Sequence, residues 1–412
     1  MFTNLSFWRH ISAAPHRSLF LAGALQGVFT LVWWVYDLAG RYAIFGTLSS
    51  WSIAPTWAHA FLMIYGFFPF FIFGFLFTTY PNWMNGKKIT PRVYLTTCLL
   101  MIAGVALFYT GLAYGKWIIV LGVTAILAGF VNAFKALLDV LLQAKDQDRR
   151  HASVTSSALF MACLGIAAYL LWLLTDAYIL LDFSRHAGIW FFLTPILLAV
   201  SHRMIPFFSS RVLDNYVIVR PYWMLWIMLA CTVAHGILQL TGFPKYLWIA
   251  DLTLALCALY LSLRWGFLRS FQVSLLAVLH ISFAWFSVSM LLYGLQSLVF
   301  MQTEENTWIL GMVPLHALAI GYFASMVLGM ASRVTIGHSG RPLVLDRYTW
   351  QLFIGFQAAV ILRILPDIIP VFGQFTPMLY LLAGLAWLSC FLLWAAHYIP
   401  IYWRPRIDGK PG

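Results

Sequence analysis

Charged residues are scarce in this sequence of 412 residues, and acidic residues are the scarcest of them. Only 9% of the residues are charged, 62% are hydrophobic, and the mean hydropathy is +0.85. A soluble domain carries about 25% charged residues. This composition excludes a soluble enzyme and leaves no stretch for a separate soluble domain. We predict an all-α polytopic membrane protein, with residues 1–412 forming one transmembrane domain.

Cysteine motifs are also lacking. The five cysteines (Cys98, Cys163, Cys231, Cys257 and Cys390) all lie in apolar segments, and no two of them form a CxxC or CxxCH pair. Covalent haem attachment and a disulfide framework are therefore not expected. The N-terminus has no short apolar run followed by a small-residue cleavage site, so we expect no cleaved signal peptide.

Long apolar runs dominate what is present. Runs of roughly 17 to 25 residues can each cross a bilayer, and they predict twelve transmembrane helices. The predicted spans are 18–37, 56–80, 93–113, 117–138, 152–174, 187–205, 221–241, 246–263, 272–299, 308–331, 349–366 and 376–402.

The basic residues give the orientation of these spans. Nineteen of the 25 Lys and Arg residues fall at the N-terminus, in the even-numbered connections and at the C-terminus, whereas five fall on the opposite side. The positive-inside rule then predicts that both termini are cytoplasmic. Because the basic residues are spread over many short loops, the net charge of +12 does not indicate nucleic-acid binding.

Histidines are the most informative polar residues in the predicted spans. Carboxylates that could line a proton path are nearly absent there, so a proton-coupled pump or carrier is poorly supported. Six histidines lie within or at the edge of spans: His59, His202, His235, His280, His316 and His397. A single buried histidine most often hydrogen-bonds to a neighbouring helix. Several at similar depth instead favour ligation of haem iron, copper or zinc by neutral imidazole.

Helical rise gives the depth of these histidines. His59, His235 and His316 all come out about 21–32 Å from the cytoplasmic end of their helices, and His280 about 13 Å from it, at 1.5 Å per residue. The pattern predicts an outer layer that could bind a haem and an inner layer whose role stays open.

One stretch combines a histidine with a basic loop. Gly311–Leu343 begins as an apolar helix containing His316 and is expected to close as a loop from Ser332 to Pro342. Arg333, His338 and Arg341 surround two glycines in this loop, a composition suited to holding an anion.

Motifs along most of the chain resemble the NnrS family, haem- and copper-containing membrane proteins linked to nitric oxide tolerance. The motifs are Pro15, Arg17, Leu19 and Phe20; HAFLMIYGF from His59 and GFLFTTYPNW after it; RMIPFF from Arg203; LHISFAW from Leu279; and HALAIGY with SRVTIGHSGRPL from His316 and Ser332. One element departs from the family. Its helix 2 usually reads His-Ala-His-Glu-Met, whereas Phe61 and Leu62 stand here in place of the second histidine and the glutamate.

The resemblance implies a haem, of b type, ligated by His59 and His316, with His280 as the next candidate. It also implies copper as a second metal, a site put in doubt by Phe61 and Leu62. His235 and His338 complete the histidines expected to ligate a metal. Nitric oxide or another small diatomic gas is the implied partner besides the lipid bilayer, and the bacterial inner membrane is the implied location.

Four arginines from separate segments are predicted to meet at the cytoplasmic ends of the helices: Arg17, Arg203, Arg333 and Arg341. They either anchor the protein to lipid headgroups or hold an anion such as a haem propionate, and the sequence leaves both readings open. A transporter without a cofactor is the alternative for the whole chain. Twelve spans suit that class, but no repeat of six plus six helices is found.

Overall fold

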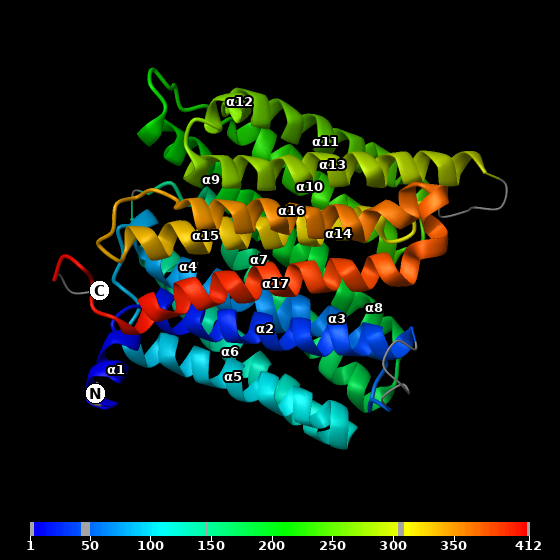
Figure 1. Cartoon of the computed structure of the whole chain (residues 1–412), viewed down its shortest axis with the longest axis horizontal. Coiled ribbons are helices and arrows are strands. Elements are labelled where there is room, and N and C mark those ends of the chain that lie inside the picture. The colour runs from blue at the N-terminus through cyan, green and yellow to red at the C-terminus, as the bar shows by residue number, and fades with distance from the viewer. Residues whose placement is uncertain (1–3, 43–49, 146, 304–308, 410–412) are drawn as a thin grey trace. The chain divides into compact units, whose positions relative to one another are not determined.

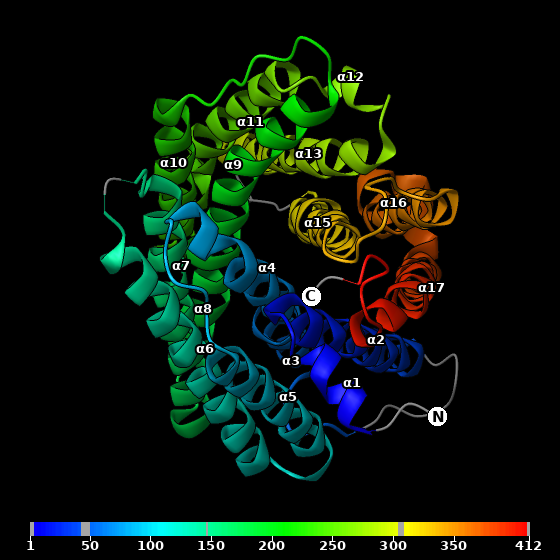
Figure 2. The same ribbon diagram turned by 90° about the vertical axis from the view of Figure 1, so that its left-hand side faces the viewer.

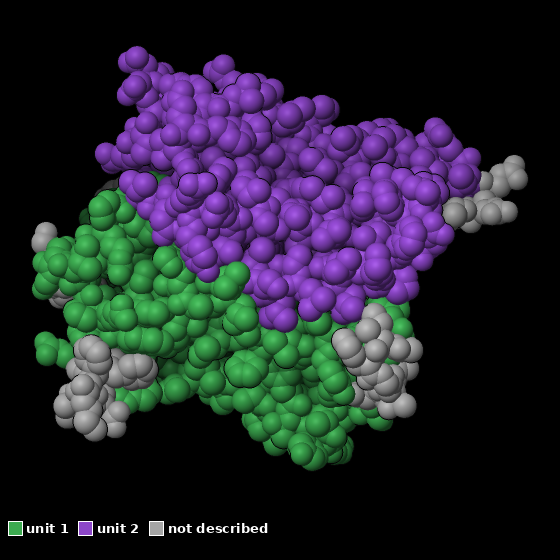
Figure 3. Space-filling view, in the orientation of Figure 1, with its two compact units in different colours: residues 1–192, 331–343, 391–412 green, residues 193–330, 344–390 purple. Residues whose placement is uncertain are grey.

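The computed structural model describes residues 4–42, 50–145, 147–303 and 309–409. Within these ranges the chain is helical and contains no strand, which confirms the all-α class (Figure 1). Twelve helical segments are long and apolar enough to cross a membrane, as the sequence predicted. These segments group into two compact units, coloured separately in Figure 3, and each unit is described by itself. That residues 1–412 make one domain stays a prediction.

Unit 1 comprises residues 1–192, 331–343 and 391–412. Its helices are α1 (Asn4–Ile11), α2 (Pro15–Arg41), α3 (Pro55–Phe61), η1 (Leu62–Phe67), α4 (Phe68–Trp83), α5 (Pro91–Tyr114), α6 (Lys116–Gln143), α7 (Arg150–Thr175), α8 (Tyr178–His186) and most of η2 (Ala187–Leu193). In Figure 2 the short helix α1 lies beside the start of α2.

Unit 2 comprises residues 193–330 and 344–390. Its helices are α9 (Thr194–Val212), α10 (Tyr222–Leu240), η3 (Pro244–Tyr246), α11 (Leu247–Arg264), α12 (Phe267–Ser270), α13 (Ser274–Gln302), α14 (Val313–His316), η4 (Ala317–Ala324), α16 (Arg347–Ile368) and η5 (Pro370–Phe375). Two helices, α15 (Ser325–Gly337) and α17 (Thr376–Trp403), begin in unit 2 and end in unit 1.

Several helices begin where the sequence offers a favourable first turn. Pro15, Pro55 and Pro91 each occupy the first position of a helix, where the missing N–H costs nothing because it would have no intrahelical partner. The side chain of Asp346 caps α16 by accepting a hydrogen bond from the Thr349 N–H at 2.6 Å.

Glycines let α5 and α6 pack backbone to backbone. A Cβ built at Gly104 would lie 2.7 Å from the Gly122 carbonyl oxygen, and one at Gly122 would lie 2.6 Å from the Gly104 oxygen. Larger side chains would hold the two helices apart, so these glycines set the distance between them.

The structure corrects several predicted boundaries. The second span continues through Pro81 to Trp83, and the sixth begins at Tyr178, nine residues before the predicted start. His186, expected just outside the sixth span, therefore lies inside it.

The predicted loop from Ser332 to Pro342 is helical as far as Gly337. Its polar residues Ser332, Arg333 and Thr335 are buried, and Thr335 donates a hydrogen bond to the Ala331 carbonyl at 2.6 Å. Polar composition alone suggested a loop, whereas these side chains have partners inside the protein.

Candidate functional site

His59 lies on α3 in unit 1 and is held by aromatic contacts. Its half-buried ring stacks on Trp34 with centroids 3.9 Å apart and an interplanar angle of 15°. The guanidinium of Arg41 lies 5.2 Å from the Trp34 ring, and Arg41 also pairs with the buried carboxylate of Asp37 at 2.7 Å. Stacking fixes the plane of the imidazole, which a metal ligand requires.

His316 ends the short helix α14 in unit 2. Its Nδ1 lies 2.9 Å from the Met312 carbonyl oxygen. Because a carbonyl oxygen can only accept, Nδ1 carries the proton and Nε2 keeps its lone pair. Metal-ligating histidines commonly donate their other ring N–H to a carbonyl in this way. The tautomer of His316 thus fits an axial haem ligand.

A π-helical segment follows closely after three half-buried histidines. The segment η1 begins three residues after His59, η2 begins directly after His186, and η4 begins directly after His316. Such segments are rare and occur frequently at functional sites. His186 did not stand out in the sequence, because residue spacing does not distinguish a π-helix from an α-helix.

The predicted pairing of His59 with His316 joins two separately described units. His59 belongs to unit 1 and His316 to unit 2. Their joint ligation of one haem stays a prediction, supported by the local surroundings of each residue.

The two positions that depart from the family helix 2 pattern have apolar surroundings. Phe61 and Leu62 are 2% and 0% exposed. The Phe61 ring stacks on Phe108 at 5.1 Å and packs against Tyr169 at 4.2 Å. Neither side chain offers a ligand atom, so a copper site that needed a histidine and a glutamate there does not fit this chain. Within the described ranges, no three His, Cys, Asp or Glu residues gather closely enough to hold a metal ion.

The other two membrane histidines of interest have partners inside unit 2. His280, 1% exposed, has its Nε2 3.1 Å from the Ser209 hydroxyl. His235 Nδ1 lies 2.5 Å from a carboxylate oxygen of Asp251, and both side chains are fully buried. The pairing of His235 with Asp251 was not predicted from the sequence. The sequence signal that could have indicated this pair is that His235 and Asp251 are ionisable residues on two consecutive antiparallel helices.

A basic cluster forms in unit 1 where α2 begins and α15 and α17 end. The rings of His16 and His338 lie 4.8 Å apart, and Arg17 donates through Nη1 to the Arg404 carbonyl at 2.9 Å. Burial, then the charges of Arg406 and Arg17, lower the pKa of His338. His338 is therefore neutral at pH 7 and contributes no positive charge to the cluster.

The four predicted arginines divide between the units. Arg17, Arg333 and Arg341 belong to unit 1, whereas Arg203 belongs to unit 2, so the convergence of all four stays a prediction. Arg17 and Arg333 are 3% and 5% exposed. This burial is more than lipid anchoring requires, and a role for either side chain inside the protein stays a prediction.

Comparison with known proteins agrees with the motifs. Curated proteins give no match to the sequence. A family model described as NnrS protein matches residues 10–406, nearly the whole chain. The chain therefore belongs to the NnrS family.

Proposed function

We propose that this protein binds a b-type haem through His59 and His316 and takes part in the response to nitric oxide. The observation that carries the proposal is the His316 Nδ1 contact with the Met312 carbonyl, which leaves Nε2 available for iron. Stacking of His59 on Trp34 supports the second ligand. Ferrous haem binds small diatomic gases such as nitric oxide at an exchangeable axial position, so nitric oxide binding would require one of the two histidines to leave the iron. A haem that kept both histidines would favour electron transfer instead.

Membership of the NnrS family and twelve apolar helices support a location in the bacterial inner membrane as a multi-pass protein. Copper remains an expectation from the family alone, because Phe61 and Leu62 provide no ligand for it.

Absorption spectra of the purified protein test the proposal. We expect a Soret band in the wild-type protein, and its loss or displacement in His316→Ala and His59→Ala. His397→Ala is the matched control, because His397 also lies in a span but is exposed. His10→Ala controls for histidines outside the spans.

Two outcomes would overturn the assignments. A colourless wild-type protein would favour the transporter alternative. Unchanged spectra in both ligand variants would move ligation to His280 or His235.

We further propose that Arg333 and Arg341 hold an anionic group through the planar guanidinium fork. A haem on His316 would lie too far away to place a propionate there, because Arg333 follows His316 by 17 residues in the same helical span, about 25 Å at 1.5 Å per residue. The group is therefore a propionate of a second haem, on His280 for instance, or a different anion. Lysine keeps the charge but cannot bind a carboxylate with two parallel hydrogen bonds. Loss of a hydrogen-bonded charge partner in a buried site costs about 2–5 kcal/mol, against about 1 kcal/mol or less for an exposed pair.

Arg333→Lys and Arg341→Lys should therefore lower haem occupancy or thermal stability. Arg347→Lys is the control, because Arg347 is exposed at the first turn of α16. Wild-type behaviour of both test variants would return these arginines to the role of lipid anchors.

A further inference from the structure

The turn after α15 leaves room for a carboxylate of the same chain. Gly340 has a φ of +78°, a conformation that residues with a Cβ rarely adopt. A Cβ built there would lie 2.8 Å from Cγ and 2.9 Å from Oδ1 of Asp408. The Asp408 carboxylate thus occupies the space that a side chain at position 340 would fill.

Hydrogen bonds hold the segment that carries Asp408 in place on both sides of Arg406, the arginine that pairs with Asp408. We call residues 404–409 the C-terminal strap. The Ile407 N–H donates to the Ser339 carbonyl at 3.1 Å, and Arg17 donates to the Arg404 carbonyl at 2.9 Å. The strap therefore lies directly over the turn.

Asp408 pairs with an arginine in a segment rich in basic residues. Arg406 binds it with two parallel hydrogen bonds, at 2.9 and 2.7 Å. Arg17 and Arg406 both act electrostatically on His338 in the same turn, and Arg341 follows Gly340 directly. Asp408 is the one acidic residue of the strap. Three arginines belong to the strap or bind to it: Arg17, Arg404 and Arg406.

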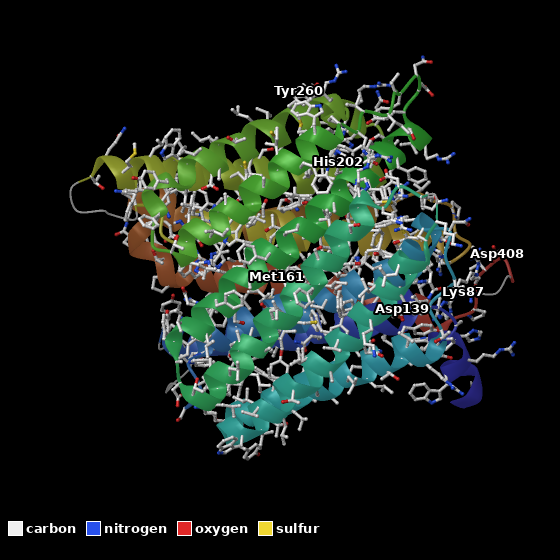
Figure 4. The ribbon with its side chains drawn as sticks, turned by 180° about the vertical axis from the view of Figure 1, so that it is seen from behind. Lys87, Asp139, Met161, His202, Tyr260 and Asp408 are labelled. Atoms are coloured by element: carbon white, nitrogen blue, oxygen red, sulfur yellow. The ribbon has the colours of Figure 1, made fainter. Side chains whose placement is uncertain are left out.

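Water can reach this carboxylate. The side chain of Asp408 is 30% exposed, whereas that of Arg406 is 18% exposed. Figure 4 labels Asp408 at the end of unit 1 where Lys87 also lies. An anion from solution or from the membrane surface could thus exchange with it without unfolding of the helices.

We propose that the turn at residues 337–340 and Arg406 form an oxyanion-binding site that Asp408 of the same chain occupies, and that an external phosphate or carboxylate group takes its place. The strap then remains attached through the Ile407 N–H, and Arg406 transfers its two hydrogen bonds from Asp408 to the incoming group. Asp408 acts as an internal competitor that sets the affinity of the site.

Titration calorimetry with inorganic phosphate tests the proposal on the full-length protein in neutral detergent and chloride buffer. If Asp408 occupies the site about nine-tenths of the time, removing its charge should tighten phosphate binding about tenfold. Asp408→Asn should therefore bind phosphate about tenfold more tightly than wild type, and Arg406→Gln combined with Asp408→Asn should lose this binding.

Asp148→Asn is the matched control. Asp148 also pairs with an arginine two residues away, Arg150, with hydrogen bonds of 2.8 and 3.2 Å. The change removes the same charge from an equivalent pair, and we expect wild-type phosphate binding. Equal affinity of wild type and Asp408→Asn, or undiminished binding by the double variant, would overturn the proposal.

Lipid nanodiscs distinguish the two sources of a phosphate group. If the natural ligand is free, Asp408→Asn should bind phosphate equally in phosphatidylcholine and phosphatidylglycerol discs. If it is a lipid headgroup, phosphatidylglycerol discs should abolish the binding. Recording the Soret band of each preparation separates a failure here from a failure of the haem proposal.

Discussion

At the scale of single residues, the His235–Asp251 pair places two ionisable side chains in the interior of unit 2. Both side chains are fully buried, and the second oxygen of Asp251 has no hydrogen-bond partner. Ionisable groups inside a membrane protein are costly and usually functional. The Asp251 carboxylate orients His235 in the way that carboxylates orient metal-ligating histidines.

Removing one member of this pair should destabilise the protein. Asp251→Ala removes the carboxylate to which His235 is hydrogen-bonded, and removing one partner of a buried hydrogen bond costs about 1–3 kcal/mol. We expect that loss in unfolding titrations with a denaturing detergent. Asp176→Ala is the control, because Asp176 pairs with Lys116 at the surface, and its loss should cost about 1 kcal/mol or less.

A double-mutant cycle gives the decisive comparison for the pair. If the two residues act as a unit, His235→Leu with Asp251→Leu should cost less than the sum of the single changes. Additive costs would show that the contact contributes nothing specific.

At the scale of helices, unit 1 brings two π-helical segments into contact. Tyr65 of η1 donates a hydrogen bond to the Ser184 carbonyl at 2.7 Å, just before η2 begins. A Cβ at Gly188 would lie 2.8 Å from the Tyr65 hydroxyl, and one at Gly165 would collide with it. Gly165 and Gly188 therefore leave the space that the Tyr65 hydroxyl occupies. There Tyr65 connects η1, which follows His59, with η2, which follows His186.

Filling that space should destabilise the contact. Gly188→Ala should lower the free energy of unfolding by about 1–3 kcal/mol, the usual cost of overpacking a core. Gly66→Ala, in the other π-helical segment η1, is the control, because the nearest neighbour of its added Cβ would be 3.5 Å away, an ordinary contact. Equal stability of the two variants in thermal unfolding would contradict this account of the contact.

The helices themselves followed from the sequence, because bilayer thickness fixes how long an apolar run must be. All twelve spans were predicted, with errors of a few residues at most ends and larger ones, of six to nine residues, at Tyr178, Val212, Gly337 and Pro370. The π-helices could not be predicted, since their hydrophobic pattern is that of an α-helix. The contacts of His16 with His338 and of Asp408 with Gly340 join distant segments, and no local pattern indicates them.

At the scale of the whole molecule, twelve membrane crossings predict that the two termini lie on the same side of the membrane. The excess of basic residues in the connections on that side predicts that it is cytoplasmic. Reporter fusions at Gly412 and directly after Gln302 should therefore report opposite sides, with Gly412 inside. Both reporters on one side of the membrane would contradict the predicted topology.

Unit 1 combines chain segments that are synthesised at widely separated times during translation. Arg17 is synthesised early, but the Arg404 and Tyr402 carbonyls that it contacts are made only after the whole of unit 2. During that interval the N-terminal helices lack the part of α17 that completes their unit. A chain that stops before Phe391 leaves the guanidinium of Arg17 without these acceptors, and a buried cation in that state is unfavourable. Such an interrupted chain would contain an incomplete unit 1, and we expect the proteases that degrade misfolded membrane proteins to remove it.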